Sequence, residues 1–236
     1  MLAETASVTV NEQDQAVKDA GTASRLAGFD AALIHGRKDG PTLVVTGAHT
    51  IALTINRSQL VTILTQAGVQ VTDVGRAADG TVVTIHTARG IRAQYGHCPA
   101  PANTLQNQVQ GPPPPSADNA DCVVLAEYPA ASLGLPPGLN VRPLEEIALE
   151  LSGMSPTESR VIEGTFDAPS ALSLPIPRFT RSYDTLEVAG ARAILLSTAG
   201  RRGPTYVLIW AKNGVLYSLS GYGSAADGAP LAASVN

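Results

Sequence analysis

The chain has 236 residues, and 44% of them are hydrophobic, so it is long enough to bury a core without cross-links. Charged residues make up only 15%, and the net charge of -4 comes without any Lys/Arg cluster beyond Arg201 and Arg202. This balance argues against nucleic acid and against an anionic membrane surface as partners.

The N-terminal part predicts a helix, a set of strands and a second helix. Asn11 is placed to cap a helix over residues 11–27 that ends at Gly28. A second helix is expected to begin at the Asn56 cap and to end at Gly68. Between the two helices, β-branched runs separated by Gly, Pro and Asp predict strands over 29–34, 42–47 and 49–56.

A proline-rich segment interrupts the middle of the chain. Residues 79–98 predict a hairpin before it, and 122–129 predict a strand apolar enough to be central in a sheet. We interpret the intervening segment, about 99–121, as an exposed loop of one α+β domain that spans 1–236. The alternative is an interdomain linker of polyproline type.

Two cysteines stand at the ends of this segment. Cys98 follows a predicted strand and Cys122 begins the next one, so a disulfide between them would close the loop at its neck. Closing a loop of this length is worth about 3 kcal/mol in the chain-entropy model. Two free thiols are the alternative, but the spacing favours the bridge, and a bridge implies an oxidising compartment.

The last part of the chain predicts paired helices followed by strands. Helices are expected over 142–153 and 155–164, the second with Ser155 as its cap and Pro156 at its first position. Asn213-Gly214 is the favoured dipeptide of a type I′ hairpin turn. Strands are expected over 185–190, 191–198, 205–211 and 215–221, and a final helix over 224–234. The whole pattern predicts an α+β fold, with a mainly antiparallel twisted sheet and helices packed on one face.

Few residues suggest chemistry. The histidines stand at positions 35, 49, 86 and 97, and none has a partner at metal-ligand spacing. The stretch from Gly221 to Ser224 is neither a nucleophile elbow nor a phosphate loop. We therefore predict no catalytic residue, no metal and no cofactor, and a protein that is not an enzyme. An enzyme of unrecognised type is kept as an alternative.

Aromatic residues concentrate in the last predicted hairpin. Tyr206, Leu208 and Trp210 share one face of a strand. They either line an apolar groove, which would suit a lipid, or fill the core under the last helix, which is the commoner use of scarce aromatic side chains.

The same stretch carries a family resemblance. YVLIWAKNGVLYSLSGYG followed by PLAASVN resembles the C-terminal part of a family of uncharacterised extracytoplasmic domains of bacterial membrane-anchored, anti-sigma-factor-like proteins. AGFDAAL, HTIALTINRSQLVTIL, VVLAEYPAASLGLPPGLNVRPLEEIALELSGMS and ALSLPIPRF look similar to other parts of such ectodomains. The family is distantly similar to lipoprotein-sorting and RseB-type domains, whose sheets cradle lipid or peptide. It supplies no catalytic residue to carry over.

The resemblance implies a non-enzymatic sensory or regulatory ectodomain at the cell surface or in the periplasm, tethered to the membrane in the full-length protein. Its expected partner is an envelope protein or an apolar ligand. A carrier of lipid or of another apolar ligand is the alternative. Because the sequence has no run of about 18 apolar residues, we expect the anchor to lie outside it.

Overall fold

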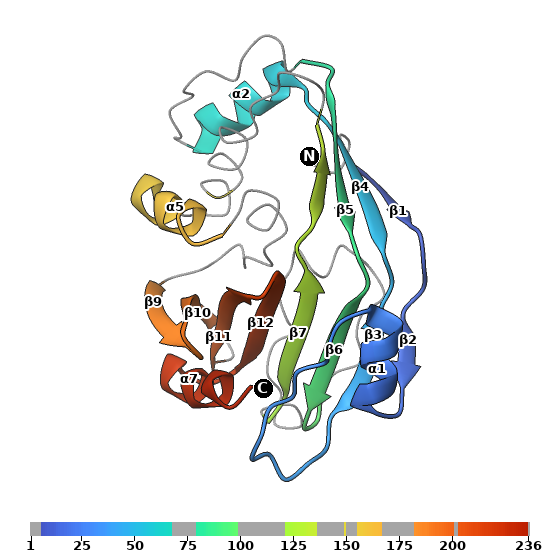
Figure 1. Ribbon diagram of the computed structural model, residues 1–236. Coiled ribbons are helices and arrows are strands. Elements are labelled where there is room, and N and C mark those ends of the chain that lie inside the picture. Colours follow the sequence, from blue (N-terminus) through green and yellow to red (C-terminus); the bar gives the residue numbers. More distant parts are fainter. Residues whose placement is uncertain are drawn as a thin grey trace. The chain divides into compact units, whose positions relative to one another are not determined.

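Antiparallel sheets dominate the structure. The computed structural model describes residues 6–67, 79–98, 121–135, 149, 155–166, 182–200 and 203–235 (Figure 1). Every strand pair in these ranges is antiparallel, and the strands form two sheets. The predicted mainly antiparallel sheet is therefore confirmed. Helices are few among the described residues, so this part of the fold is mainly β rather than clearly α+β as predicted.

The chain forms two compact units, each built from three separate segments. The first contains 1–13, 48–88 and 130–174, and the second contains 14–47, 89–129 and 175–236. Residues 99–120 of the predicted proline-rich loop lie outside the described ranges. The prediction of a single domain over 1–236 stays a prediction.

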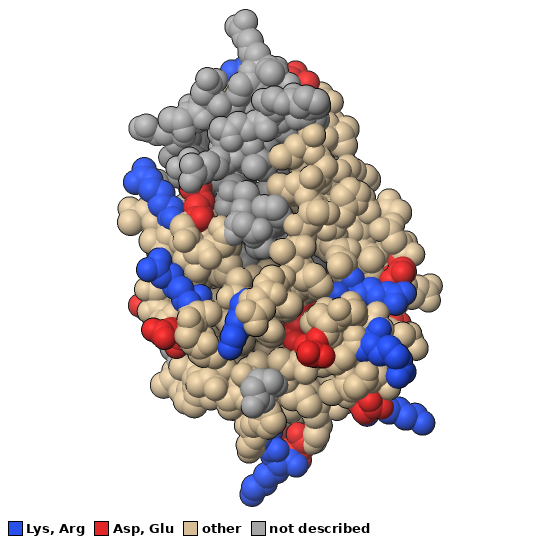
Figure 2. Space-filling model, viewed as in Figure 1, with Lys and Arg blue, Asp and Glu red and all other residues tan. Residues whose placement is uncertain are grey.

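The first unit contains a four-stranded sheet in the order β1-β4-β5-β8. Its strands are β1 (Ala6–Val10), β4 (His49–Thr54), β5 (Val82–Thr87) and β8 (Ser132–Gly134). Val83 and Ile85 are buried on one face, whereas Thr and Ser prevail on the other. The four strands contain no Lys, Arg, Asp or Glu, and Figure 2 shows the corresponding uncharged surface.

Two of the described helices belong to the same unit, and both begin as the sequence predicts. In α2 (Arg57–Ala67), Asn56 Oδ1 accepts a hydrogen bond from the Gln59 N–H at 3.1 Å. In α5 (Pro156–Glu163), Ser155 and Glu158 form a capping box. The helix predicted over 142–153 lies outside the described residues, apart from the buried Leu149.

The second unit contains an eight-stranded sheet in the order β2-β3-β6-β7-β12-β11-β10-β9. Its strands are β2 (Gln15–Val17), β3 (Thr42–Thr46), β6 (Gly90–Tyr95), β7 (Val123–Pro129), β9 (Ser182–Val188), β10 (Ala191–Gly200), β11 (Gly203–Lys212) and β12 (Val215–Tyr222). Asn213 (φ 53°) and Gly214 (φ 76°) have the positive φ angles that a type I′ turn requires, which confirms the predicted β11–β12 hairpin.

The described helices of the second unit, α1 (Ala20–Ala27) and α7 (Ala225–Ala233), contact one face of this sheet. Helix α1 lies against β2, β3 and β6, and α7 lies against β9, β11 and β12. Ala23 of α1 is fully buried with Val45 and Ile91. The main core lies between the sheet and α7, and its largest fully buried members are Tyr95, Leu125, Tyr206, Leu208, Trp210 and Leu219.

The helix predicted over 11–27 is wrong in its first half. The structure has β2 there, and α1 begins only after Asp19, whose Oδ1 accepts a hydrogen bond from the Thr22 N–H at 2.8 Å. Asn11, the predicted cap, instead donates through Nδ2 to Thr50 Oγ1. Asp19 suits the cap better because its carboxylate contacts both the N–H and the hydroxyl of Thr22.

Two other predictions fail for a non-local reason. Residues 29–34 form no strand, only a single bridge from Ile34 to Val235. The hairpin over 79–98 does not form, because β5 pairs with β4 and β8 while β6 pairs with β3 and β7. The connecting Ala88-Arg89 lacks a residue with positive φ, unlike the Asn213-Gly214 turn.

Candidate functional site

A buried carboxyl group lies in the centre of the eight-stranded sheet. Glu127 of β7 is 0% exposed, and its Oε2 accepts a hydrogen bond from the backbone N–H of Ala32 at 2.9 Å. Its Oε1 is also buried and has no hydrogen-bond partner. Burial raises the pKa of Glu127 to about 7, although the Ala32 N–H acts in the opposite direction.

The strand period places this carboxyl among core residues. Val123, Leu125 and Glu127 alternate along β7 and therefore share the face that packs into the core. In the register of the sheet, Ile91 of β6 and Tyr217 of β12 stand opposite Glu127. Sequence reasoning overlooked Glu127, although an acid at an inward position of the apolar run CVVLAEYP was the available signal.

The segment that follows α1 is held over this face by side chains of the sheet. The N–H of Ile34 donates to the Tyr95 hydroxyl at 2.8 Å, two residues beyond the Ala32 bond to Glu127. Ile34 also bridges to Val235 at the end of α7. Two sheet side chains thus replace the strand partners that this segment lacks.

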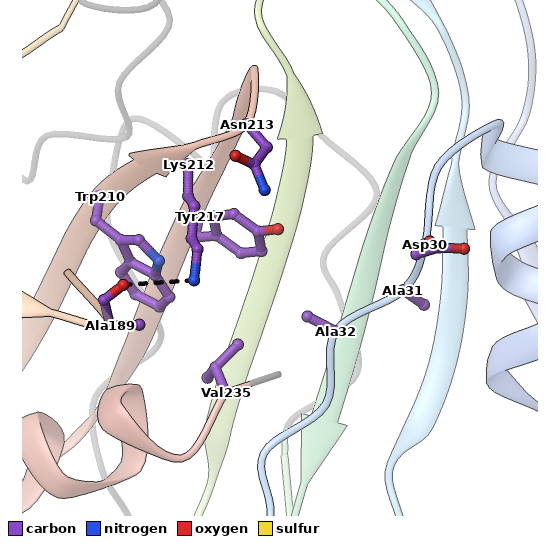
Figure 3. Close-up of a pocket in the computed structure, with 9 residues that line it drawn as sticks. All are labelled: Asp30, Ala31, Ala32, Ala189, Trp210, Lys212, Asn213, Tyr217 and Val235. Carbon is purple, nitrogen blue, oxygen red and sulfur yellow. Dashed lines mark hydrogen bonds between the residues drawn. The ribbon is translucent and has the colours of Figure 1, made fainter. Parts of the chain in front are cut away.

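A pocket of about 210 Å³ opens beside this segment. Its aromatic wall comes from the β11–β12 hairpin, where the rings of Trp210 and Tyr217 stack with centroids 5.2 Å apart and planes at 7°. Lys212 reaches across Trp210 and donates from Nζ to the Ala189 carbonyl at 3.4 Å. Figure 3 shows the lining residues, which are Asp30, Ala31, Ala32, Ala189, Trp210, Lys212, Asn213, Tyr217 and Val235.

Glu127 adjoins two of the residues that line this pocket. It is hydrogen-bonded to Ala32 on one wall and stands beside Tyr217 on the other, and β7 runs between them in Figure 3. The pKa of Tyr217 is raised by burial and, to a smaller extent, by the negative charge of Glu127. The carboxyl itself is fully buried behind these two residues and is not part of the pocket lining.

The arrangement is suited to binding. The apolar and aromatic walls, with Asp30 and Lys212 as the charged residues of the lining, favour a small ligand that is partly apolar. The lining contains no Ser, Cys or His to act as a nucleophile beside a base.

The residues of the predicted apolar groove separate into two environments. Tyr206, Leu208 and Trp210 are 1%, 0% and 1% exposed and belong to the core cluster. Trp210 also lines the pocket, whereas Tyr206 and Leu208 do not. Tyr206 packs between β12 and α7. A Cβ added at Gly221 of β12 or at Gly228 of α7 would lie 2.5 Å from its hydroxyl or ring atoms.

The predicted disulfide is present at the neck of the proline-rich segment. Cys98 and Cys122 are bonded, with an S–S distance of 2.10 Å. The residue before each cysteine adds a second link, since Asp121 accepts hydrogen bonds from the backbone N–H and from Nδ1 of His97, both at 3.0 Å. The backbone bond is the main cause that lowers the pKa of Asp121.

The remaining candidates give no further site. Across the described ranges, His, Cys, Asp and Glu side chains do not gather in threes around a point that a metal ion could occupy. His86 Nδ1 lies within hydrogen-bond distance of Thr50 Oγ1, at 3.2 Å. The helices in this part of the chain are all too short or too polar to cross a membrane.

The fold and the site together define a mainly-β, disulfide-bonded protein with a small pocket lined by an aromatic pair. The chain matches no protein-family model, no curated protein and no solved structure.

Proposed function

We propose that the protein is a non-enzymatic extracytoplasmic domain with a sensory or regulatory role, which binds a small ligand in the pocket beside Trp210 and Tyr217. The observation that carries the compartment is the Cys98–Cys122 disulfide. Disulfides persist in oxidising compartments and are rare in the reducing cytosol. A tether to the membrane is part of the proposal and would lie outside the described helices.

The pocket supports the binding role. It combines two stacked aromatic side chains with the polar side chains of Asp30, Lys212 and Asn213, and such convergence of apolar walls and a few polar groups is typical of ligand sites. Two segments that are far apart in the sequence also border the pocket. One is the Ala31–Ile34 segment after α1, and the other is Val235 after α7, which forms a bridge with Ile34. A ligand in contact with them is thus able to change their packing, as a sensory domain requires.

Labelling of intact cells tests the compartment. The three lysines of the chain, Lys18, Lys38 and Lys212, are all exposed. A membrane-impermeant, amine-reactive biotin reagent should therefore label the protein while the cytoplasmic membrane is intact, as judged by an unlabelled cytosolic protein in the same sample. Labelling only after lysis would overturn the extracytoplasmic proposal.

A further inference from the structure

We infer that residues 29–35 form a pH-sensitive strap, which is closed over the eight-stranded sheet while Glu127 is protonated and opens when Glu127 loses its proton. The strap follows α1 and supplies Ala31 and Ala32 to the lining of the pocket, so its opening changes one wall of that pocket. The inference adds a regulatory device to the proposed domain and does not require the pocket to hold a ligand.

Two side chains of the sheet hold the middle of the strap. The N–H of Ala32 donates to Glu127 Oε2 at 2.9 Å, and the N–H of Ile34 donates to the Tyr95 hydroxyl at 2.8 Å. In the part of the chain that the structure describes, the bridge from Ile34 to Val235 is the only strand-like pairing of the strap. The closed position therefore depends strongly on the bond to Glu127.

Ionisation of Glu127 weakens the closed state. Its carboxyl is 0% exposed, its Oε2 has the Ala32 N–H as donor, and its Oε1 has none. A buried carboxylate needs several donors or a cation to replace its lost hydration, whereas a neutral carboxyl is much cheaper to bury. The charged form thus favours a conformation in which water reaches the carboxyl. Among the described residues, the strap is the segment outside the sheet that hydrogen-bonds to Glu127, so its displacement is the movement we expect.

The other titratable groups on this side of the sheet do not account for such a switch. Tyr95 of β6 and Tyr217 of β12 are close enough to Glu127 for its charge to raise their pKa values, but burial is the main cause and keeps both tyrosines neutral near pH 7. The charged or titratable side chains of the strap, of both helices and of the start of β6 are exposed to water: Asp19, Arg25, Asp30, His35, Arg89 and Asp227.

The basic side chains around this region are engaged elsewhere. Arg37 and Lys212 donate to backbone carbonyls at 3.0 and 3.4 Å. Arg92 of β6 is paired with Asp14 at 3.8 Å, and the alternation of the strand turns it to the face opposite Glu127. No cation offsets the carboxylate, in agreement with the rise of the Glu127 pKa to about 7 that burial causes.

Hydrogen exchange of backbone amides, measured by NMR without any ligand, tests the strap. Each rate is divided by the intrinsic rate at the same pH to give a protection factor. Protection of the Ala32 and Ile34 amides should fall about tenfold from pH 6 to pH 8, because the opened strap exposes a carboxyl that ionises more readily than the buried one. Protection that does not change with pH would overturn the inference.

Dilute urea separates opening of the strap from global unfolding. Exchange of the Ala32 and Ile34 amides should be insensitive to urea, since a small movement exposes little surface. The amide of Leu208, which is fully buried in β11, should be better protected and should exchange faster as urea is added. Strap amides that exchange only at the Leu208 rate would show that no separate opening exists.

Two variants assign the switch to its group. Glu127→Gln keeps an acceptor for the Ala32 N–H but cannot ionise, so the protection of the strap should no longer depend on pH. His35→Gln removes the exposed histidine of the strap and should keep the wild-type pH dependence. The opposite pattern would overturn the role of Glu127. If Glu127→Gln does not fold, the wild-type pH series decides. Because these experiments involve neither a ligand nor the cell, this inference and the proposed function can fail separately.

Discussion

The Oε2 of Glu127 and the backbone N–H of Ala32 join two segments 95 positions apart in the sequence through a hydrogen bond of 2.9 Å. This bond links the middle of the eight-stranded sheet to the segment that borders the pocket. Because the carboxyl is fully buried, the stability of the protein depends on its ionisation state. The position of Ala32, which lines the pocket, depends on the same group.

Stability should fall as the pH rises through neutrality. The pKa of Glu127 increases from 4.5 in the unfolded chain to about 7 in the folded one, so the folded state holds an extra proton between these values. The resulting stabilisation is complete below pH 4.5 and is lost as the pH rises through about 7. It amounts to about 3 kcal/mol. Urea unfolding at a series of pH values measures it.

Glu127→Gln isolates this contribution. The variant cannot ionise, so its stability should change less between pH 5 and pH 8 than that of the wild type, and it should be the more stable of the two at pH 8. Glu187→Gln, which changes an exposed acid of the same type, should follow the wild-type profile. Parallel pH profiles for wild type and Glu127→Gln would show that Glu127 is not the responsible group.

Loss of the disulfide should destabilise the second unit. Replacing both Cys98 and Cys122 by Ser frees a loop with a sequence separation of 24, which costs about 3 kcal/mol in the chain-entropy model. The denaturation midpoint should fall by the corresponding amount. Reductant should lower the midpoint of the wild type and leave that of the double variant unchanged. An unchanged wild-type midpoint would contradict the structural role of the bridge.

Gly221 should not tolerate a side chain. Its absent Cβ leaves room for Tyr206, and Gly221→Ala would place a methyl group 2.5 Å from the Tyr206 hydroxyl. We expect a loss of about 1–3 kcal/mol from overpacking. Gly40→Ala is the matched control, because nothing lies within 4 Å of its Cβ position, and it should be neutral. Thermal unfolding compares the two, and equal melting temperatures would mean that Tyr206 packs differently.

The true start of α1 can be tested by two single substitutions. Asp19→Ala removes the cap that the structure shows, so the melting temperature should fall by a few degrees. Asn11→Ala removes only an exposed side-chain bond to Thr50 and should change it little. The reverse order would support the longer helix that the sequence alone predicts.

The features that the sequence predicts well are local ones. The β11–β12 hairpin follows from alternating residues around Asn213-Gly214, and α5 follows from the Ser155-Pro156 start and Glu158. In each case the residues that predict the element lie within that element or next to it. The Cys98–Cys122 pairing was also accessible, because the chain has only two cysteines.

The features that the sequence does not reveal depend on distant partners. β5 and β6 are adjacent in sequence yet join different sheets, since each is paired on both sides by strands from elsewhere in the chain. The candidate site also depends on residues that are distant in the sequence. Nothing near Glu127 in the sequence indicates that Ala32 supplies its donor and that Tyr217 stands beside it.

The central claim, that this protein works in an oxidising compartment, is tested most directly by the state of Cys98 and Cys122 in the cells that produce it. Cells are quenched in acid, the protein is unfolded and alkylated with and without reductant, and its intact mass is measured. We expect no alkyl group without reductant and two after reduction. Two alkyl groups without reductant would show free thiols and contradict the extracytoplasmic assignment.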